Sequence, residues 1–205
     1  DLMTVTVNAN PTPIITGPNS VCAQEAGVVY STGNSGNLFS WNVMGGTIIS
    51  GQGTNTINVT WDNGPVGAII LTETIATSGC SVSTPAFIVN VNPLPSPTIN
   101  GNAVVCESAS GMVYSTANTP GNTYNWTITG GIIVAGQGTN QITVDWGVSG
   151  NGTLTVTETI TATGCSATSP VYSVTIQSLP TPAISGVNEV CENHAGAVYS
   201  TPGTP

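Results

Sequence analysis

The sequence predicts an all-β protein made of tandem β-sandwiches, and three observations support this prediction. Apolar and polar residues alternate along short segments, which is the pattern of strands with one buried face. Thr, Val, Ile and Asn dominate the chain, with 25 Gly and 14 Pro as turn and linker residues. The chain also repeats itself, because residues 41–61 and 126–146 are identical at 12 of 21 positions without a gap.

The repeat has a period of 84 to 85 residues. Cys22, Cys106 and Cys191 are separated by 84 and 85 residues (106 − 22; 191 − 106). Nearly the same spacing relates four further pairs: Tyr30 and Tyr114, Trp41 and Trp126, Trp61 and Trp146, and Cys80 and Cys165. The period therefore predicts whole repeats at residues 11–94 and 95–179, and the start of a further, truncated repeat at 180–205.

The first ten residues match the end of a repeat. The sequence M-T-V-T-V-N at 3–8 resembles F-I-V-N-V-N at 87–92, so residues 1–10 are predicted to be the last strand of a preceding repeat. A P-x-P motif at each junction stiffens the link toward an extended conformation. Because both ends would cut through a repeat, we expect a longer array. Its partners would be neighbouring repeats of the same chain or adjacent copies in a filament.

About seven strands are expected in each repeat. In the first repeat the alternation places them at residues 14–16, 28–31, 38–44, 47–50, 57–61, 68–76 and 87–91. Gly45 and Gly46 make a tight turn, and the sequence G-Q-G-T-N at 51–55, which recurs at 136–140, makes a longer one. Antiparallel strands with one apolar face pack as two sheets, so each repeat of about 85 residues is predicted to be a sandwich.

Large aromatic residues fall on the apolar phase of these strands. Trp41, for example, shares its phase with Phe39 and Val43. We therefore expect a structural core that contains Tyr30, Trp41, Trp61, Tyr114, Trp126 and Trp146. The alternative is a carbohydrate-binding surface on which a sugar stacks against an exposed Trp.

Two glutamates also share the apolar phase. Alternation points the carboxylates of Glu73 and Glu158 inward, where they need hydrogen-bond donors or a proton. We expect buried structural carboxylates bonded to a Trp indole N–H or a Thr hydroxyl, and a bulge that turns them outward is the alternative. Catalysis would require a second titratable group nearby, which each repeat scarcely offers.

The charge composition excludes several partners and chemistries. The chain has no Lys or Arg, nine Asp or Glu and one His. Without cations it cannot neutralise phosphates, so we expect no nucleic-acid partner and no attraction to an anionic membrane. No apolar run reaches the length needed for membrane insertion. His194 stands where the other repeats have Ala109 and Glu25, and the acids are scattered, so we expect no catalytic residue, no cofactor and no metal site.

The order of these residues resembles a known family. A Cys, the sequence V-Y-S, a Trp on the third strand, I-x-V-x-W and a G-C pair before the last strand are similar to PKD-like (polycystic-kidney-disease-type) repeats. Those repeats are immunoglobulin-like modules of large secreted surface proteins of Bacteroidota, including adhesins of gliding bacteria. The resemblance covers the whole chain and implies tandem immunoglobulin-like sandwiches. Typical members continue the Trp strand into Gly-Asp-Gly. Gly45-Gly46 and Gly130-Gly131 lack that Asp, so its role does not carry over.

Cysteines recur at two positions in each full repeat. We expect one disulfide within each sandwich, Cys22 with Cys80 and Cys106 with Cys165, as is typical of secreted proteins. A metal or redox pair is the alternative. Four cysteines allow three pairings, so the spacing leaves the connectivity open. Cys191 would lack a partner because its repeat is truncated.

These features together predict a structural, non-enzymatic protein. We expect a stalk or filament segment of a large extracellular adhesin at the bacterial cell surface, involved in gliding motility or in contact with surface glycans or other cells. The absence of Lys and Arg removes every trypsin-type cleavage site, which suits a stalk. The alternatives are a non-catalytic glycan-binding module and an accessory segment of a secreted hydrolase.

Overall fold

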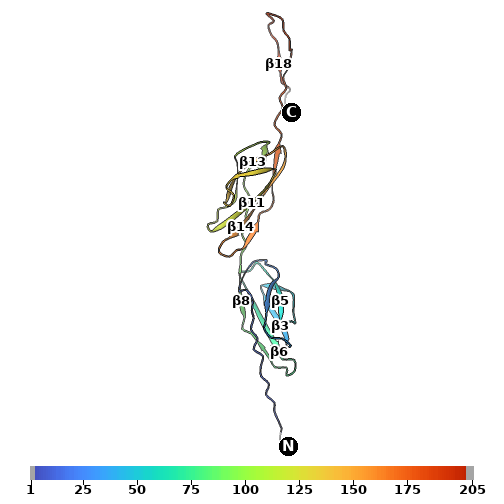
Figure 1. Ribbon diagram of the computed structural model, residues 1–205, viewed down its shortest axis with the longest axis vertical. Coiled ribbons are helices and arrows are strands. Elements are labelled where there is room, and N and C mark those ends of the chain that lie inside the picture. Colours follow the sequence, from blue (N-terminus) through green and yellow to red (C-terminus); the bar gives the residue numbers. More distant parts are fainter. Residues whose placement is uncertain (1–2, 202–205) are drawn as a thin grey trace. The chain divides into compact units, whose positions relative to one another are not determined.

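The computed structural model describes residues 3–201, and every regular element in that range is a β-strand (Figure 1). Those residues accordingly include no helix long and apolar enough to cross a membrane. The chain separates into two compact units. One contains the residues up to Ser96 together with Thr119–Thr123 and Glu158–Ala167. The other contains Pro97–Asn118, Tyr124–Thr157 and the residues from Thr168 onward.

The first repeat folds as two sheets that share one core. One sheet has the strand order β1–β8–β6–β3, with β7 joined to β6, and the other has the order β2–β5–β4. Neighbouring strands are antiparallel, except that β1 runs parallel to β8. The strands are β1 (Ser20–Cys22), β2 (Val28–Ser31), β3 (Leu38–Met44), β4 (Gly46–Ser50), β5 (Thr56–Trp61), β6 (Val66–Thr74), β7 (Ser81–Ser83) and β8 (Phe87–Asn92).

The second repeat has the same topology, as the sequence repeat requires. Its sheets have the orders β9–β16–β14–β11, with β15 joined to β14, and β10–β13–β12. The strands are β9 (Val104–Cys106), β10 (Met112–Ser115), β11 (Asn122–Thr129), β12 (Gly131–Ala135), β13 (Gln141–Trp146), β14 (Gly150–Ile160), β15 (Ser166–Thr168) and β16 (Tyr172–Gln177). The prediction of an all-β fold of tandem immunoglobulin-like sandwiches is therefore confirmed.

The observed strands differ from the predicted ones where the segments are too short to show alternation. No strand forms at 14–16, where the chain makes only the isolated bridge Thr16↔Ser31, next to prolines that lack a backbone donor. The three-residue strand β1 follows instead and pairs in parallel with β8, and the equally short β7 follows β6. Each repeat therefore has eight strands rather than about seven.

The end segments lie outside the two sandwiches. Residues 3–10 form no strand, and Met3, Val5 and Val7 are exposed, so the expected strand of a preceding repeat is not formed in the part of 1–10 that the structure describes. The physical reason is that no second strand pairs with this segment. In the described part of the third repeat, residues 180–201, the regular structure is a two-stranded sheet of β17 (Ser185–Gly186) and β18 (Tyr199–Ser200).

The aromatic residues expected in the core are buried. Their exposed fractions lie between 0 and 3%: Tyr30, Trp41, Trp61, Tyr114, Trp126 and Trp146. Within each repeat the Tyr and the second Trp meet edge to face, with ring centroids 5.9 Å apart in the first and 5.8 Å in the second. Burial raises the pKa of Tyr30 to about 12. None of these rings presents a free face on which a sugar could stack.

Two glycines allow the close packing around the second Trp of each repeat. A Cβ added to Gly67 would lie 2.0 Å from Cζ3 of Trp61, and one added to Gly152 would lie 2.2 Å from Cζ3 of Trp146. Neither glycine has a positive φ, so it is the space taken by the indole ring that requires glycine here.

The G-Q-G-T-N turn has the same sequence in both repeats, and the structure gives a reason for this: its Gln side chain caps an edge strand. β3 is the last strand of its sheet, so its outer backbone groups lack a neighbouring strand. The Trp41 N–H donates to Oε1 of Gln52 at 3.0 Å, and Nε2 of Gln52 donates to the Trp41 carbonyl at 2.8 Å. Gln137 makes the same two bonds with Trp126, at 3.0 and 2.9 Å. The side chain therefore joins the β4–β5 turn of one sheet to the edge of the other.

Candidate functional site

Both core glutamates are buried and bonded to side-chain amides. Glu73 on β6 is fully buried and accepts hydrogen bonds from the amide nitrogens of Asn34, at 2.7 Å, and Asn37. Glu158 occupies the same place in the second repeat, where Asn122 donates to its Oε1 at 2.6 Å. A carboxylate surrounded by donors in this way joins strands and loops at the end of a core.

The donors to Glu73 differ from those expected. The indole N–H of Trp41, one of the expected donors, bonds instead to the Thr54 carbonyl at 2.8 Å. This bond uses the one donor of the indole ring and joins β3 to the β4–β5 turn of the opposite sheet. Asn34 and Asn37 lie in that loop, and their amides reach Glu73 directly. Sequence reasoning missed them because loop asparagines are common for turn reasons alone.

The cysteines pair across the repeats and not within them. Cys22 is bonded to Cys165, with a Cα–Cα distance of 5.5 Å, whereas Cys80, Cys106 and Cys191 are free. Both bonded residues belong to the first compact unit, which includes Glu158–Ala167 at the end of the β14–β15 hairpin. The expected pairs, Cys22 with Cys80 and Cys106 with Cys165, are therefore wrong in this structure.

The topology of one sheet explains why the expected pairs fail. Cys22 lies opposite Asn92 on β8, at the end of the sheet where Val66 begins β6. Cys80 comes after Thr74, at the other end of β6. The nine residues of β6 cover about 26 Å at about 3.3 Å per residue. A disulfide requires Cα atoms within about 7 Å, so these two thiols cannot meet.

The second repeat has the same separation. Cys106 lies opposite Gln177, beside the start of β14, and Cys165 comes after the far end of that strand. The eleven residues of β14 cover about 33 Å. In both repeats, one cysteine is at each end of the same sheet.

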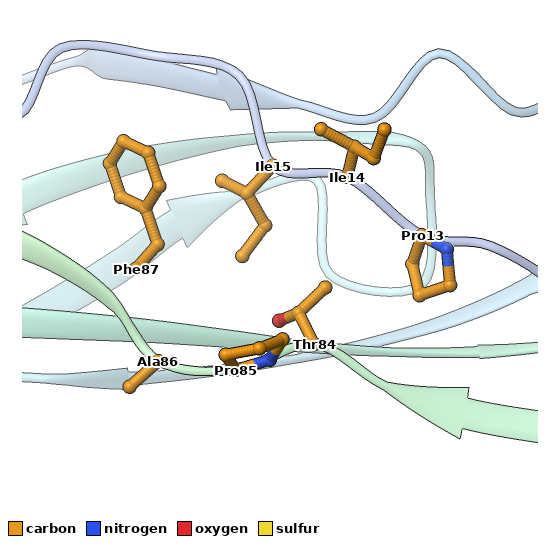
Figure 2. Close-up of a pocket in the computed structure, with 7 residues that line it drawn as sticks. All are labelled: Pro13, Ile14, Ile15, Thr84, Pro85, Ala86 and Phe87. Atoms are coloured by element: carbon orange, nitrogen blue, oxygen red, sulfur yellow. The ribbon is translucent and has the colours of Figure 1, made fainter.

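An apolar hollow of about 320 Å³ lies on the first sandwich, where the segment before β1 passes the connection from β7 to β8 (Figure 2). Its lining residues are Pro13, Ile14, Ile15, Thr84, Pro85, Ala86 and Phe87. The only polar side chain among them, that of Thr84, accepts a hydrogen bond from the Leu71 N–H at 3.1 Å. The hollow can therefore accept an apolar group, but it offers no charged side chain for catalysis or for recognising a polar ligand.

The remaining candidate residues form no cluster. His194 is exposed, and its backbone N–H closes a turn onto the Cys191 carbonyl at 3.1 Å. Within residues 3–201, no three His, Cys, Asp or Glu side chains lie close enough together to hold a metal ion. The expectation that the chain has no metal, no cofactor and no catalytic residue stays a prediction.

A comparison with protein families gives a match over most of the chain. A family model for the PKD-like domain matches it twice, at residues 7–91 and 92–176. These ranges begin and end within four residues of the repeats predicted from the period. No curated protein matches the chain.

Solved structures that resemble the chain share little sequence with it. The fibronectin(III)-like modules of CbhA from Clostridium thermocellum are 13% identical, with 80% of this chain and 95% of theirs covered and a TM-score of 0.36. The D0–D1 domain of intimin is 15% identical, with 79% and 97% covered and a TM-score of 0.29. SGBP-B of the Bacteroides ovatus mixed-linkage glucan utilization locus, solved with a heptasaccharide, is 15% identical, with 82% and 48% covered and a TM-score of 0.31. At this level of similarity none of them supports an argument about function.

Proposed function

This chain belongs to the PKD-like domain family, and we propose that it is a structural segment of a stalk in a large extracellular adhesin at the bacterial cell surface. PKD-like domains and a disulfide are typical of extracellular proteins. The proposed role is mechanical: the repeats supply length, and they remain folded when the stalk is pulled.

The observation that carries this proposal is the Cys22–Cys165 bond. It closes a loop with a sequence separation of 143, which includes most of both sandwiches. A force applied to the two ends of the chain passes through the bond and bypasses the enclosed residues. Those residues cannot be drawn out while the bond is intact, so tension cannot extend most of either repeat. A chain that only displays a binding surface does not require this arrangement.

Two further observations support a scaffold over the glycan-binding alternative. The four Trp residues, together with Tyr30 and Tyr114, are buried in the cores, so these six rings are not available as stacking surfaces for sugars. The hollow of Figure 2 lacks the convergent polar groups that orient a carbohydrate. We also propose that the segment has no enzymatic activity of its own, since the buried carboxylates are held by amides in the core.

Single-molecule force spectroscopy tests the mechanical role. The oxidised chain, pulled from its ends, should show no extension from the residues between Cys22 and Cys165. Reduction should release them and add about 500 Å of contour length, at about 3.5 Å for each of 143 residues. Cys80→Ser is the matched control and should behave as the wild type, because Cys80 is free.

Two results would contradict the proposed function. One is an equal extension of the oxidised and the reduced chain, which would show that the bond shields nothing from tension. The other is specific retention of a glycan by the folded chain, lost on unfolding, which would favour the binding module.

A further inference from the structure

The cysteine near the start of each repeat is held by the same backbone turn. We call Cys22, Cys106 and Cys191 the opening cysteines. The residue two positions later has a positive φ in all three, of 61° at Gln24, 60° at Ser108 and 65° at Asn193. The N–H three positions later donates to the cysteine carbonyl in all three, at 3.1, 3.2 and 3.1 Å. These are the only non-glycine residues with positive φ among the residues that the structure describes. The bonded Cys22 and the free Cys106 are therefore presented alike.

The cysteine after the long central strand is also held alike in both repeats. We call Cys80 and Cys165 the hairpin cysteines. Each follows a glycine with positive φ, 72° at Gly79 and 76° at Gly164. The carbonyl of each accepts the N–H of the residue five positions earlier, at 2.9 Å in both repeats. Cys80 is thus a second copy of the hairpin that reaches Cys22 through Cys165.

The surroundings of Cys22 and Cys106 differ in exposure, because the bonded hairpin lies beside Cys22 and has no counterpart beside Cys106 within residues 3–201. Around Cys22, the side chain of Leu94 packs against the core, and Cys22 and Leu94 line one hollow together with Gly164 and Ser166 of the bonded hairpin. Around Cys106, the thiol is exposed, and Leu179, the counterpart of Leu94, is 50% exposed. Leu179 is nevertheless held in place, because its N–H donates to Oε1 of Glu107 at 3.0 Å.

We propose that Cys106 and Leu179 form a docking site for the hairpin cysteine of a following PKD-like repeat, with which Cys106 forms a disulfide. In the same way, Cys80 would form a disulfide with the opening cysteine of a preceding repeat. The occupant is identified from the pair already formed, since a turn with the same backbone hydrogen bond at Cys22 is bonded to a hairpin with the same backbone hydrogen bond at Cys165. Pairing within a repeat is excluded by the strand lengths described above. Each repeat would then be cross-linked to both of its neighbours, and every free cysteine in the chain would have its partner in another repeat. This inference concerns covalent connectivity and does not depend on the proposed mechanical role.

The bond would form by thiol–disulfide exchange with an external disulfide such as oxidised glutathione. One cysteine thiolate attacks the glutathione disulfide and releases one glutathione thiolate. The second cysteine thiolate then attacks the mixed disulfide, forms the protein S–S bond and releases a second glutathione thiolate. Two protein thiols are oxidised, one glutathione disulfide is reduced, and the two protons pass to the buffer or the released thiolates.

A chain with a completed third repeat provides the test. Pro205 corresponds in sequence to Pro120, 85 residues earlier, so a second copy of residues 121–179 can follow Pro205 in register. After folding in a glutathione redox buffer, peptide mapping of the unreduced protein should find two bonds, Cys22–Cys165 and Cys106 to the appended hairpin cysteine. Cys80 and Cys191 should be recovered as alkylated thiols. Replacing the appended cysteine by serine is the matched control, and Cys106 should then be alkylated as in the unextended chain.

Several outcomes would overturn the proposal. A bond from Cys106 to Cys80 or to Cys165 in either chain would show a different pairing rule. A free Cys106 in the extended chain, with Cys22–Cys165 formed, would show that the equivalent turn binds no hairpin. Loss of the Cys22–Cys165 bond in the unextended chain would remove the pair from which the occupant was identified. None of these results requires a force measurement, so failure here is distinguishable from failure of the mechanical role.

Discussion

Replacing Cys22 by serine tests the cross-repeat disulfide through the stability of the protein. The bond closes a loop with a sequence separation of 143, and the chain-entropy treatment of a loop of this length gives about 5 kcal/mol. Cys22 is half-buried, so a serine hydroxyl there can reach water, whereas serine at the buried Cys165 would add a burial cost of its own. We therefore expect Cys22→Ser to lower the free energy of unfolding, summed over both repeats, by about 5 kcal/mol.

Unfolding in guanidinium chloride, followed by tryptophan fluorescence, measures this loss. All four Trp residues are buried, two in each repeat, so the signal reports on both cores. With a slope of about 4 kcal/mol per M, the midpoint should fall by about 1 M. Reduction of the wild type should produce the same shift, and reductant should leave the midpoint of Cys22→Ser unchanged.

Cys80→Ser distinguishes the observed pairing from pairing within the repeat. Cys80 is also half-buried but is free, so this variant should keep the stability of the wild type. If Cys80→Ser lost as much stability as Cys22→Ser, the two residues would be bonded to each other. That result would refute the argument that they lie at opposite ends of one sheet.

Three further predictions concern the core of the first repeat. Gly67→Ala should lower the free energy of unfolding, measured by urea titration, by about 3 kcal/mol, because its Cβ would lie 2.0 Å from the Trp61 ring. Gly33→Ala is the control and should leave that free energy unchanged, because its Cβ would meet nothing within 4 Å. Glu73→Gln should lower stability by about 1–3 kcal/mol, because an amide donor then faces the donors of Asn34 and Asn37; an unchanged melting temperature would contradict this. Burial raises the pKa of Tyr30 from 10.0 to about 12, so its protonated phenol stabilises the fold below pH 10, and this contribution is lost as the pH rises through 12. Tyr30→Phe should therefore show a shallower fall in melting temperature over that pH range, and equal slopes for variant and wild type would count against it.

The sequence by itself determined the longer strands, their inward faces and the two tandem repeats. Apolar alternation is a local property, and it was enough to place Tyr30, Trp41 and Trp61 in the core and to point Glu73 inward. The two repeats carry the same apolar pattern, so the two sandwiches have the same topology. Short elements escaped this reasoning, because the three residues of β1 or β7 hold too little pattern to show a period.

Only the tertiary structure decided which groups meet. The donors to Glu73 come from a loop that carries no periodic pattern, and Gln52 is recognisable as an edge-strand cap only once β3 is known to end its sheet. The cysteine pairing depends on strand direction and length. The spacing of Cys22 and Cys80 suggests a pair, but β6 carries the chain about 26 Å from one to the other. Cys22 is bonded instead to Cys165, on a hairpin of the next repeat. The reason is that the two cysteines of one repeat lie at opposite ends of one long strand, so each can bond only with a cysteine of another repeat.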